Sequence, residues 1–134
     1  MREPVEYIVG VADPGGLRVL IVDDDRDICL LFETGLTLLG YTVVIAQNGS
    51  DALAVMAPGQ VLPSVIVADL HMPVMDGWQF LTALADDPRL ASVPVIVLTA
   101  ADDPSRSAPR PSTTLIKPIS MTDLAAAINA AARA

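Results

Sequence analysis

The sequence predicts an α/β domain with a parallel β-sheet covered by helices on both faces. Short apolar segments of strand type alternate with helical segments along most of the chain, which is typical of repeated βαβ units. The clearest strand, residues 65–68, is apolar at every position, as expected for a strand buried on both faces. It runs into Asp69. Ligands of open α/β sheets bind at the carboxyl ends of the strands, so Asp69 marks a candidate site.

Length, charge and cysteine content limit the classes of function. The chain has 134 residues, of which 52% are hydrophobic and 18% charged, as in one globular domain. A formal net charge of −8 argues against direct binding to nucleic acid or anionic membranes. There is no signal-peptide pattern and no apolar run long enough to span a bilayer. The single cysteine, Cys29, fits a reducing cytoplasm and is expected to be a buried, unreactive thiol.

The chain opens with an arm and the first strand–helix unit. Residues 1–16 contain proline and glycine and are expected to form a flexible arm before a domain at 17–134. The strand at 17–22 runs into three consecutive aspartates, and a helix follows from about 27 to 39 until Gly40. Helical spacing places its core face at Ile28, Leu31, Phe32, Gly35 and Leu39.

The remaining elements continue the alternation. Turn residues and β-branched runs set the expected strands at 41–46, 65–68, 93–98 and 115–116, and the expected helices at 50–56, 78–85 and 120–134. Ser50 and Ser120 are the expected N-caps of their helices, and Asp123 follows Ser120 at capping-box spacing. Between the last two strands, prolines 104, 109 and 111 predict a loop where alternation would place a helix.

Residues suited to phosphoryl transfer follow four of the strands. Asp23 and Asp24 follow the first strand, Asp69 the third, Thr99 the fourth and Lys117 the fifth. Because parallel strands end at one edge of the sheet, these side chains are expected to converge. Clustered carboxylates repel one another unless a hard dication such as Mg²⁺ lies among them. Each residue alone has an ordinary structural explanation; their coincidence indicates phosphoryl chemistry, which needs positioning and charge neutralisation.

The same residues resemble the receiver domains of two-component response regulators. The resemblance covers about residues 17–134 and implies a flavodoxin-like, doubly wound sheet of five parallel strands in the order 2-1-3-4-5. Because the sequence ends with the last helix, we expect a single-domain receiver. The matching motifs are Leu20-Ile21-Val22-Asp23-Asp24-Asp25, Asp69 with Met72-Pro73-x-Met75-Asp76-Gly77, Leu98-Thr99-Ala100, and Lys117-Pro118.

The resemblance also implies roles for the acidic residues. Asp69 would accept a phosphoryl group from a phosphohistidine, carried by a histidine kinase or a histidine phosphotransfer protein. Mg²⁺ (or Mn²⁺) would be bound directly by Asp24 and mainly through water by Asp23, with Asp69 and the main-chain carbonyl of His71 completing the set. The protein would not be a conventional enzyme, although it would catalyse its own phosphorylation and slow autodephosphorylation.

The phosphoryl-binding side of the site follows from the same resemblance. Thr99 with Ala100 would be the switch that moves to the phosphoryl group, and Lys117 would contact that group, with the Lys117–Pro118 peptide bond cis. One departure is Thr114, which stands where the family usually has an aromatic residue.

The other departure is the proline-rich segment at 101–112. Output is therefore expected through protein–protein contact with a non-standard surface, and we hypothesise that this loop orders on phosphorylation. A homodimer contact through Leu30, Leu36 or Leu38 of the first helix is a further hypothesis.

Two alternatives remain open at this stage. A phosphatase of the haloacid dehalogenase type would use Asp23 as nucleophile with Asp25 as its partner. A degenerate receiver would act only as a binding module.

Overall fold

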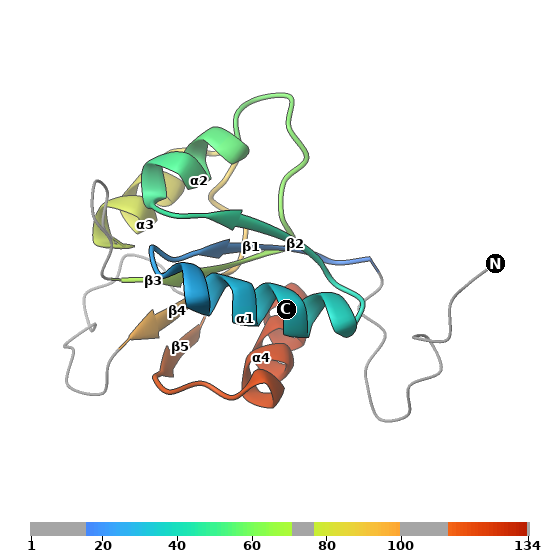
Figure 1. Ribbon diagram of the computed structural model, residues 1–134. Helices are drawn as coiled ribbons and strands as arrows, with labels where there is room; N and C mark the ends of the chain where they lie inside the picture. Colours follow the sequence, from blue (N-terminus) through green and yellow to red (C-terminus); the bar gives the residue numbers. More distant parts are fainter. Residues whose placement is uncertain (1–15, 71–76, 100–112, 134) are drawn as a thin grey trace.

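The computed structural model describes residues 16–70, 77–99 and 113–133. Within these ranges the chain forms five strands and four helices (Figure 1). The expected arm lies almost wholly outside the described residues, and so do His71, Ala100 and the predicted loop at 101–112. In chain order the elements are β1 (Arg18–Val22), α1 (Arg26–Leu38), β2 (Thr42–Ala46), α2 (Gly49–Val55), β3 (Val65–Asp69), α3 (Gly77–Asp86), β4 (Val95–Thr99), β5 (Thr113–Ile116) and α4 (Met121–Arg133).

The strands form one parallel sheet in the order β2-β1-β3-β4-β5. This confirms the flavodoxin-like order. Helices α1 and α4 lie on one face of the sheet and α2 and α3 on the other, so β1 and β3 are covered from both sides (Figure 1). None of the helices in the described ranges combines the length and hydropathy needed to cross a membrane.

Alternate residues of the central strands pack into two cores. On β1, Leu20 belongs to the core beneath α2 and α3, which also contains Phe80, whereas Ile21 belongs to the core beneath α1 and α4. Leu36 of α1 and Leu124 of α4 are fully buried in the second core. Every residue of β3 and β4 is buried, which explains why these segments are continuously apolar up to their last residue.

Local capping groups fix the helix starts. Ser120 caps α4 as predicted, because its Oγ accepts a hydrogen bond of 3.0 Å from the N–H of Asp123. The prediction for α2 was wrong: the N-cap is Asn48, whose side chain accepts from the N–H of Asp51 at 2.8 Å, and Ser50 lies inside the helix. Asparagine and serine are both good N-caps, so composition alone does not choose between neighbouring positions.

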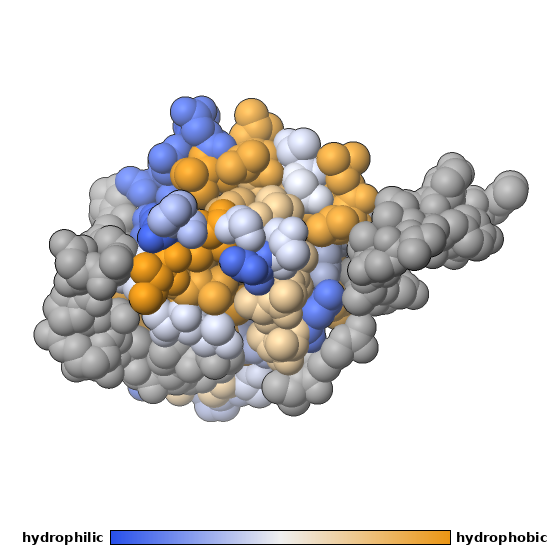
Figure 2. Space-filling model, turned by 90° about the horizontal axis from the view of Figure 1, so that it is seen from below, coloured by the Kyte–Doolittle hydropathy of each residue, from blue (hydrophilic) through white to orange (hydrophobic). Residues whose placement is uncertain are grey.

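The core face of α1 differs from the one expected. Leu31 is 59% exposed, whereas Leu36, expected outside the core, is fully buried together with Cys29 and Phe32. The hypothesis of a dimer contact is therefore wrong for Leu36 and stays a prediction for Leu30 and Leu38, which are exposed. Helix α1 is apolar around much of its circumference, so spacing did not identify which stripe faces the sheet. Figure 2 shows the surface from below, where large hydrophobic areas border more polar ones.

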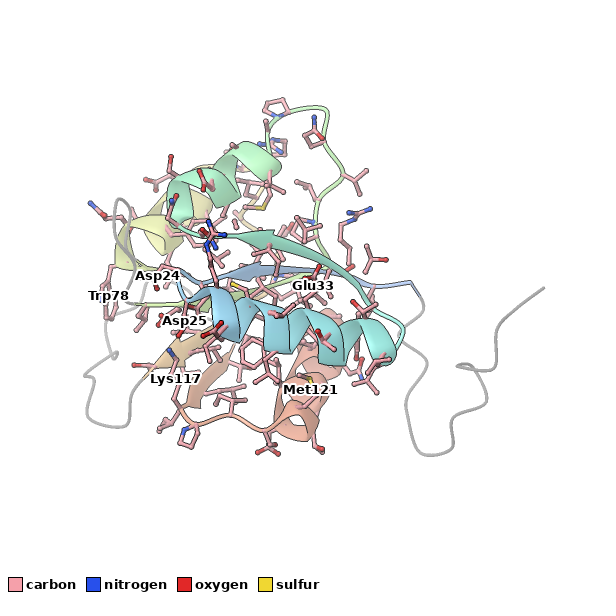
Figure 3. All side chains as sticks on the ribbon, in the orientation of Figure 1. Asp24, Asp25, Glu33, Trp78, Lys117 and Met121 are labelled. Atoms are coloured by element: carbon pink, nitrogen blue, oxygen red, sulfur yellow. The ribbon has the colours of Figure 1, made fainter. Side chains whose placement is uncertain are left out.

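Helices α1 and α4 approach each other closely at Gly35. A Cβ atom added to Gly35 would lie 2.5 Å from Cε and 3.0 Å from Sδ of Met121, so the glycine lets this side chain lie against α1. Figure 3 shows Met121 at the start of α4, next to α1. The contact joins the middle of α1 to the first residue of α4.

We therefore expect Gly35→Ala and Met121→Ala to be coupled. Alanine gains about 1 kcal/mol in helix propensity over glycine. In the Gly35→Ala single variant the new methyl group displaces the Met121 side chain, and the cost of this displacement offsets the gain. When Met121 is also replaced by alanine, the gain is realised. Urea unfolding of the two single variants and the double variant should give a coupling free energy of at least about 0.5 kcal/mol. Additive effects would show that Met121 does not occupy this space.

Candidate functional site

Strand register brings the predicted site residues to one edge of the sheet. Residues at the carboxyl end of each strand pair with one another as follows: Val22 with Ala68, Asp69 with Leu98, and Thr99 with Ile116. The residues that follow β1 and β5 therefore lie beside the ends of β3 and β4. Figure 3 shows Asp24, Asp25 and Lys117 at this edge of the molecule.

Three carboxylates meet at this edge. Asp23, Asp24 and Asp69 each offer an oxygen, and these oxygens lie within 4.8 Å of one another. Asp23 and Asp69 are buried, with 2% and 6% of their surface exposed, while Asp24 is exposed. The cluster therefore has a buried floor and one side open to solvent.

Among the described residues, only one of the two carboxylate oxygens of Asp23 has a hydrogen-bond donor. Its Oδ1 accepts a hydrogen bond of 2.9 Å from the N–H of Asp25, but its buried Oδ2 has no hydrogen-bond partner among the described residues. The pKa of Asp23 is raised to about 6, chiefly by burial and also by the neighbouring carboxylates of Asp69 and Asp24, against the lowering effects of the Asp25 N–H and Lys117. A buried carboxylate oxygen without a partner, beside two other carboxylates, fits a hard divalent cation.

Lys117 supplies positive charge to the same cluster. Its Nζ lies 3.4 Å from Oδ1 of Asp69, and its side chain is 40% exposed against 8% for that of Asp69. Its main-chain N–H donates to the carbonyl of Thr99 at 2.8 Å, which joins the ends of β4 and β5. The Lys117–Pro118 peptide bond is cis, as expected. Thr99 is 2% exposed and is therefore buried at the end of β4, next to Lys117.

Asp25 has a different task from its two neighbours. Its Oδ1 accepts from the N–H groups of Asp27 at 2.9 Å and Ile28 at 3.2 Å, and so caps α1. It is not a member of the three-carboxylate cluster. The geometry therefore does not support the phosphatase alternative, in which Asp23 and Asp25 would act together.

Cys29 contacts the site, which sequence analysis missed. As predicted, the thiol is buried, and burial raises its pKa to about 11 with further contributions from the nearby aspartates. Its Sγ also donates a hydrogen bond of 3.3 Å to the main-chain carbonyl of Asp23. The position of Cys29 in the first turn after the acidic stretch was the available signal, but spacing does not reveal a contact between a thiol and a carbonyl.

The departure at Thr114 is visible on β5. Thr114 pairs with Val97 in the sheet and is exposed, as is Ile116 two residues later. A small polar side chain thus occupies the position at which receiver domains are expected to carry an aromatic residue.

Comparison with known proteins gives the family. A family model for the response regulator receiver domain matches residues 19–129. The chain belongs to this family. As a curated relative of this receiver domain, the transcriptional regulatory protein PrrA of Mycobacterium tuberculosis is 43% identical over 91 residues, which cover 68% of this chain and 36% of PrrA. The response regulator PleD of Caulobacter vibrioides is 41% identical over 85 residues, covering 63% of this chain and 18% of PleD. This chain spans about a third of the length of the first relatives it matches.

Solved structures support the same assignment. The receiver domain resembles the chemotaxis response regulator CheY4 of Vibrio cholerae with a TM-score of 0.78 and 28% identity, over 87% of this chain and 98% of that one. It resembles the receiver domain of the sensor histidine kinase PA1611 from Pseudomonas aeruginosa with a TM-score of 0.78 and 26% identity, over 89% and 99% of the two chains. That structure holds a magnesium ion coordinated in its active-site cleft.

We expect Asp23→Asn to change how stability depends on pH when no divalent cation is present. Because the pKa of Asp23 is raised to about 6, the folded state holds this proton more tightly than the unfolded chain. The contribution of Asp23 to the free energy of unfolding is therefore most favourable at low pH. It falls by up to about 3 kcal/mol as the pH rises from about 4 to about 6. Asparagine keeps an acceptor for the Asp25 N–H and carries no charge. The unfolding free energy of the variant should therefore not show this decrease between pH 4 and pH 6.

Urea unfolding in EDTA at pH 5 and pH 7.5 tests this expectation. The variant should be more stable than the wild type at pH 7.5, and the difference should shrink at pH 5. Asp123→Asn, which alters an exposed carboxylate of α4 outside the cluster, is the control and should keep the wild-type slope. An unchanged slope in Asp23→Asn would contradict the burial of a charge at this position.

Proposed function

We propose that this receiver domain accepts a phosphoryl group on Asp69 from the phosphohistidine of a histidine kinase or a histidine phosphotransfer protein. The observation that carries the proposal is the position of Asp69. Its carboxylate lies in the three-carboxylate cluster and 3.4 Å from the ammonium of Lys117, at the carboxyl edge of a parallel sheet. These contacts support the proposal, because a carboxylate acting as nucleophile would lie beside an ammonium group that can stabilise the charge of a phosphoryl group.

The transfer is a displacement at phosphorus. A carboxylate oxygen of Asp69 forms a bond to phosphorus while the bond from phosphorus to the histidine nitrogen breaks, and the imidazole leaves with that electron pair. The product is an acyl phosphate on Asp69. Lys117 is near enough to Asp69 to pair with the phosphoryl oxygens as they arrive, which reduces the repulsion between phosphate and the acidic cluster.

Asp23, Asp24 and Asp69 are the residues that would hold Mg²⁺, or Mn²⁺, together with the main-chain carbonyl of His71. The bound ion would neutralise the acidic cluster and the charge of the phosphoryl group. The unpartnered Oδ2 of Asp23 supports this part of the proposal, because it is a buried acceptor that the described residues leave unused.

We propose that Thr99, followed by Ala100, contacts the phosphoryl group and carries the signal to the surface. Thr99 is buried at the end of β4, and its carbonyl accepts a hydrogen bond from the main-chain N–H of Lys117. Since Thr114 is an exposed threonine, the signal would leave through a surface other than the usual aromatic switch. The output would be contact with a downstream protein in the cytoplasm, with no role for nucleic acid or membrane binding.

We expect Asp69→Asn to abolish phosphorylation. Incubation of the wild type with a small phosphoryl donor such as acetyl phosphate and Mg²⁺ should add the mass of one phosphoryl group, and peptide mapping should locate it on Asp69. The amide of the variant is not a nucleophile, so no mass should be added, while Asp123→Asn should behave as the wild type. Label on Asp23 would favour a phosphatase, and the absence of label from the wild type with both small and protein donors would favour a binding module.

We expect Lys117→Met to change phosphorylation and cation binding in opposite directions. Removing the ammonium takes away a charge that stabilises the incoming phosphoryl group, and we expect phosphorylation to slow by about tenfold or more. It also removes a cation that competes for Asp69, so Mg²⁺ should bind about threefold or more tightly. Stopped-flow phosphorylation and isothermal titration with MgCl₂ measure the two effects. A parallel loss of both would show that Lys117 acts by holding the fold of the site.

A further inference from the structure

We propose that Cys29 is a positioning residue for the acidic pair Asp23 and Asp24, acting through its hydrogen bond to the carbonyl of Asp23. The proposal rests on the proposed function, because it concerns how tightly the acidic cluster binds a divalent cation. It assigns the thiol no contact with the phosphoryl group and no chemistry of its own.

Asp23 is held at three of its polar atoms. Its N–H donates to the carbonyl of Ala46 at the end of β2 at 3.1 Å, and its Oδ1 accepts from the N–H of Asp25 at 2.9 Å. Its carbonyl accepts from Sγ of Cys29 at 3.3 Å. The polar atom that remains is the buried Oδ2, which has no partner among the described residues and belongs to a residue of the three-carboxylate cluster. The contacts therefore immobilise the residue while leaving one oxygen for a ligand.

The thiol acts on both acids because of where the carbonyl lies in the chain. The carbonyl of Asp23 belongs to the peptide unit that joins Asp23 to Asp24, and this unit is planar. Holding its oxygen fixes the plane, and the plane sets the directions in which both side chains leave the main chain. The other two contacts do not do this: one is made by the N–H of Asp23, which belongs to the preceding peptide unit, and the other is made by the Asp23 side chain.

The location of Cys29 makes its hydrogen bond hard to replace. Cys29 is 4% exposed, in the core between α1 and the sheet, and Asp23 is 2% exposed. Water is therefore a poor substitute, and a buried carbonyl that loses its donor is destabilised or turns towards another partner. The contact also spans from the end of β1 to the buried face of α1, so it links the acidic edge to the helix that covers it.

Two matched pairs of variants separate the donor from the volume of the side chain. Cys29→Ala lacks the donor and Cys29→Ser keeps one, and the two differ by a single hydroxyl. Cys29→Val and Cys29→Thr repeat the comparison at a larger volume, so the test survives if one pair folds poorly. The control is Leu36→Val, which removes volume from the same core two turns farther along α1 and leaves the site untouched.

The readout is the dissociation constant for Mg²⁺, measured by isothermal titration with MgCl₂, alongside the unfolding free energy in EDTA. We expect Cys29→Ala and Cys29→Val to weaken Mg²⁺ binding by about 3- to 10-fold, as is typical when a hydrogen bond that orients a metal ligand is lost. Cys29→Ser and Cys29→Thr should bind within about twofold of the wild type, by the same reasoning. Leu36→Val should lose stability without a change in Mg²⁺ affinity.

Three results would overturn the proposal. Wild-type affinity in the folded Cys29→Ala and Cys29→Val variants would show that the thiol does not position the acids. Equal weakening in all four variants would assign the effect to packing. A wild type that does not bind Mg²⁺ would overturn the proposed function and the role of Cys29 together, whereas the first two results leave the proposed function intact.

Discussion

The site depends on two carboxylates buried side by side, Asp23 and Asp69, at the ends of adjacent parallel strands. Burying a charge without a partner is costly, and two like charges close together add to that cost. The protein offsets it incompletely: Lys117 pairs with Asp69, whereas one oxygen of Asp23 is left without a partner among the described residues. The same arrangement supports the proposed cation site, because a divalent cation would reduce the repulsion between the carboxylates and would pair with the unpartnered oxygen of Asp23.

The sheet keeps this arrangement in place. A shift of one residue between β1 and β3 would move Asp23 away from Asp69 and would also turn the apolar residues of β1 towards the wrong core. The register that pairs Val22 with Ala68 is therefore fixed by two separate cores, one on each face, in which Leu20 and Ile21 are almost completely buried. The same packing that stabilises the domain thus sets the spacing of its acidic residues.

The sequence predicted the strands and the residues at their ends well because both follow from simple patterns. A continuous apolar run that stops at a polar residue, as at Asp69 or Thr99, marks a buried strand and its end together. The order of the strands came from the family resemblance, because alternation alone allows several orders. What was mispredicted or missed depended on three-dimensional packing: the stripe of α1 that faces the sheet, the choice of Asn48 as the N-cap of α2, and the contact of Cys29 with Asp23.

Three consecutive aspartates have three different environments, which shows how position decides the role of a residue type. Asp23 is buried at the strand end, Asp24 is exposed in the cluster, and Asp25 is used to cap α1. Capping needs only a short side chain with an oxygen, so a carboxylate is not required at the third position, whereas the proposed cation site would use the carboxylates at the first two. The turn therefore combines two separate functions in adjacent residues: it begins the helix, and it directs two acids towards the edge of the sheet. Cys29 connects the two, because it lies in the helix that Asp25 begins and holds the carbonyl from which Asp24 extends.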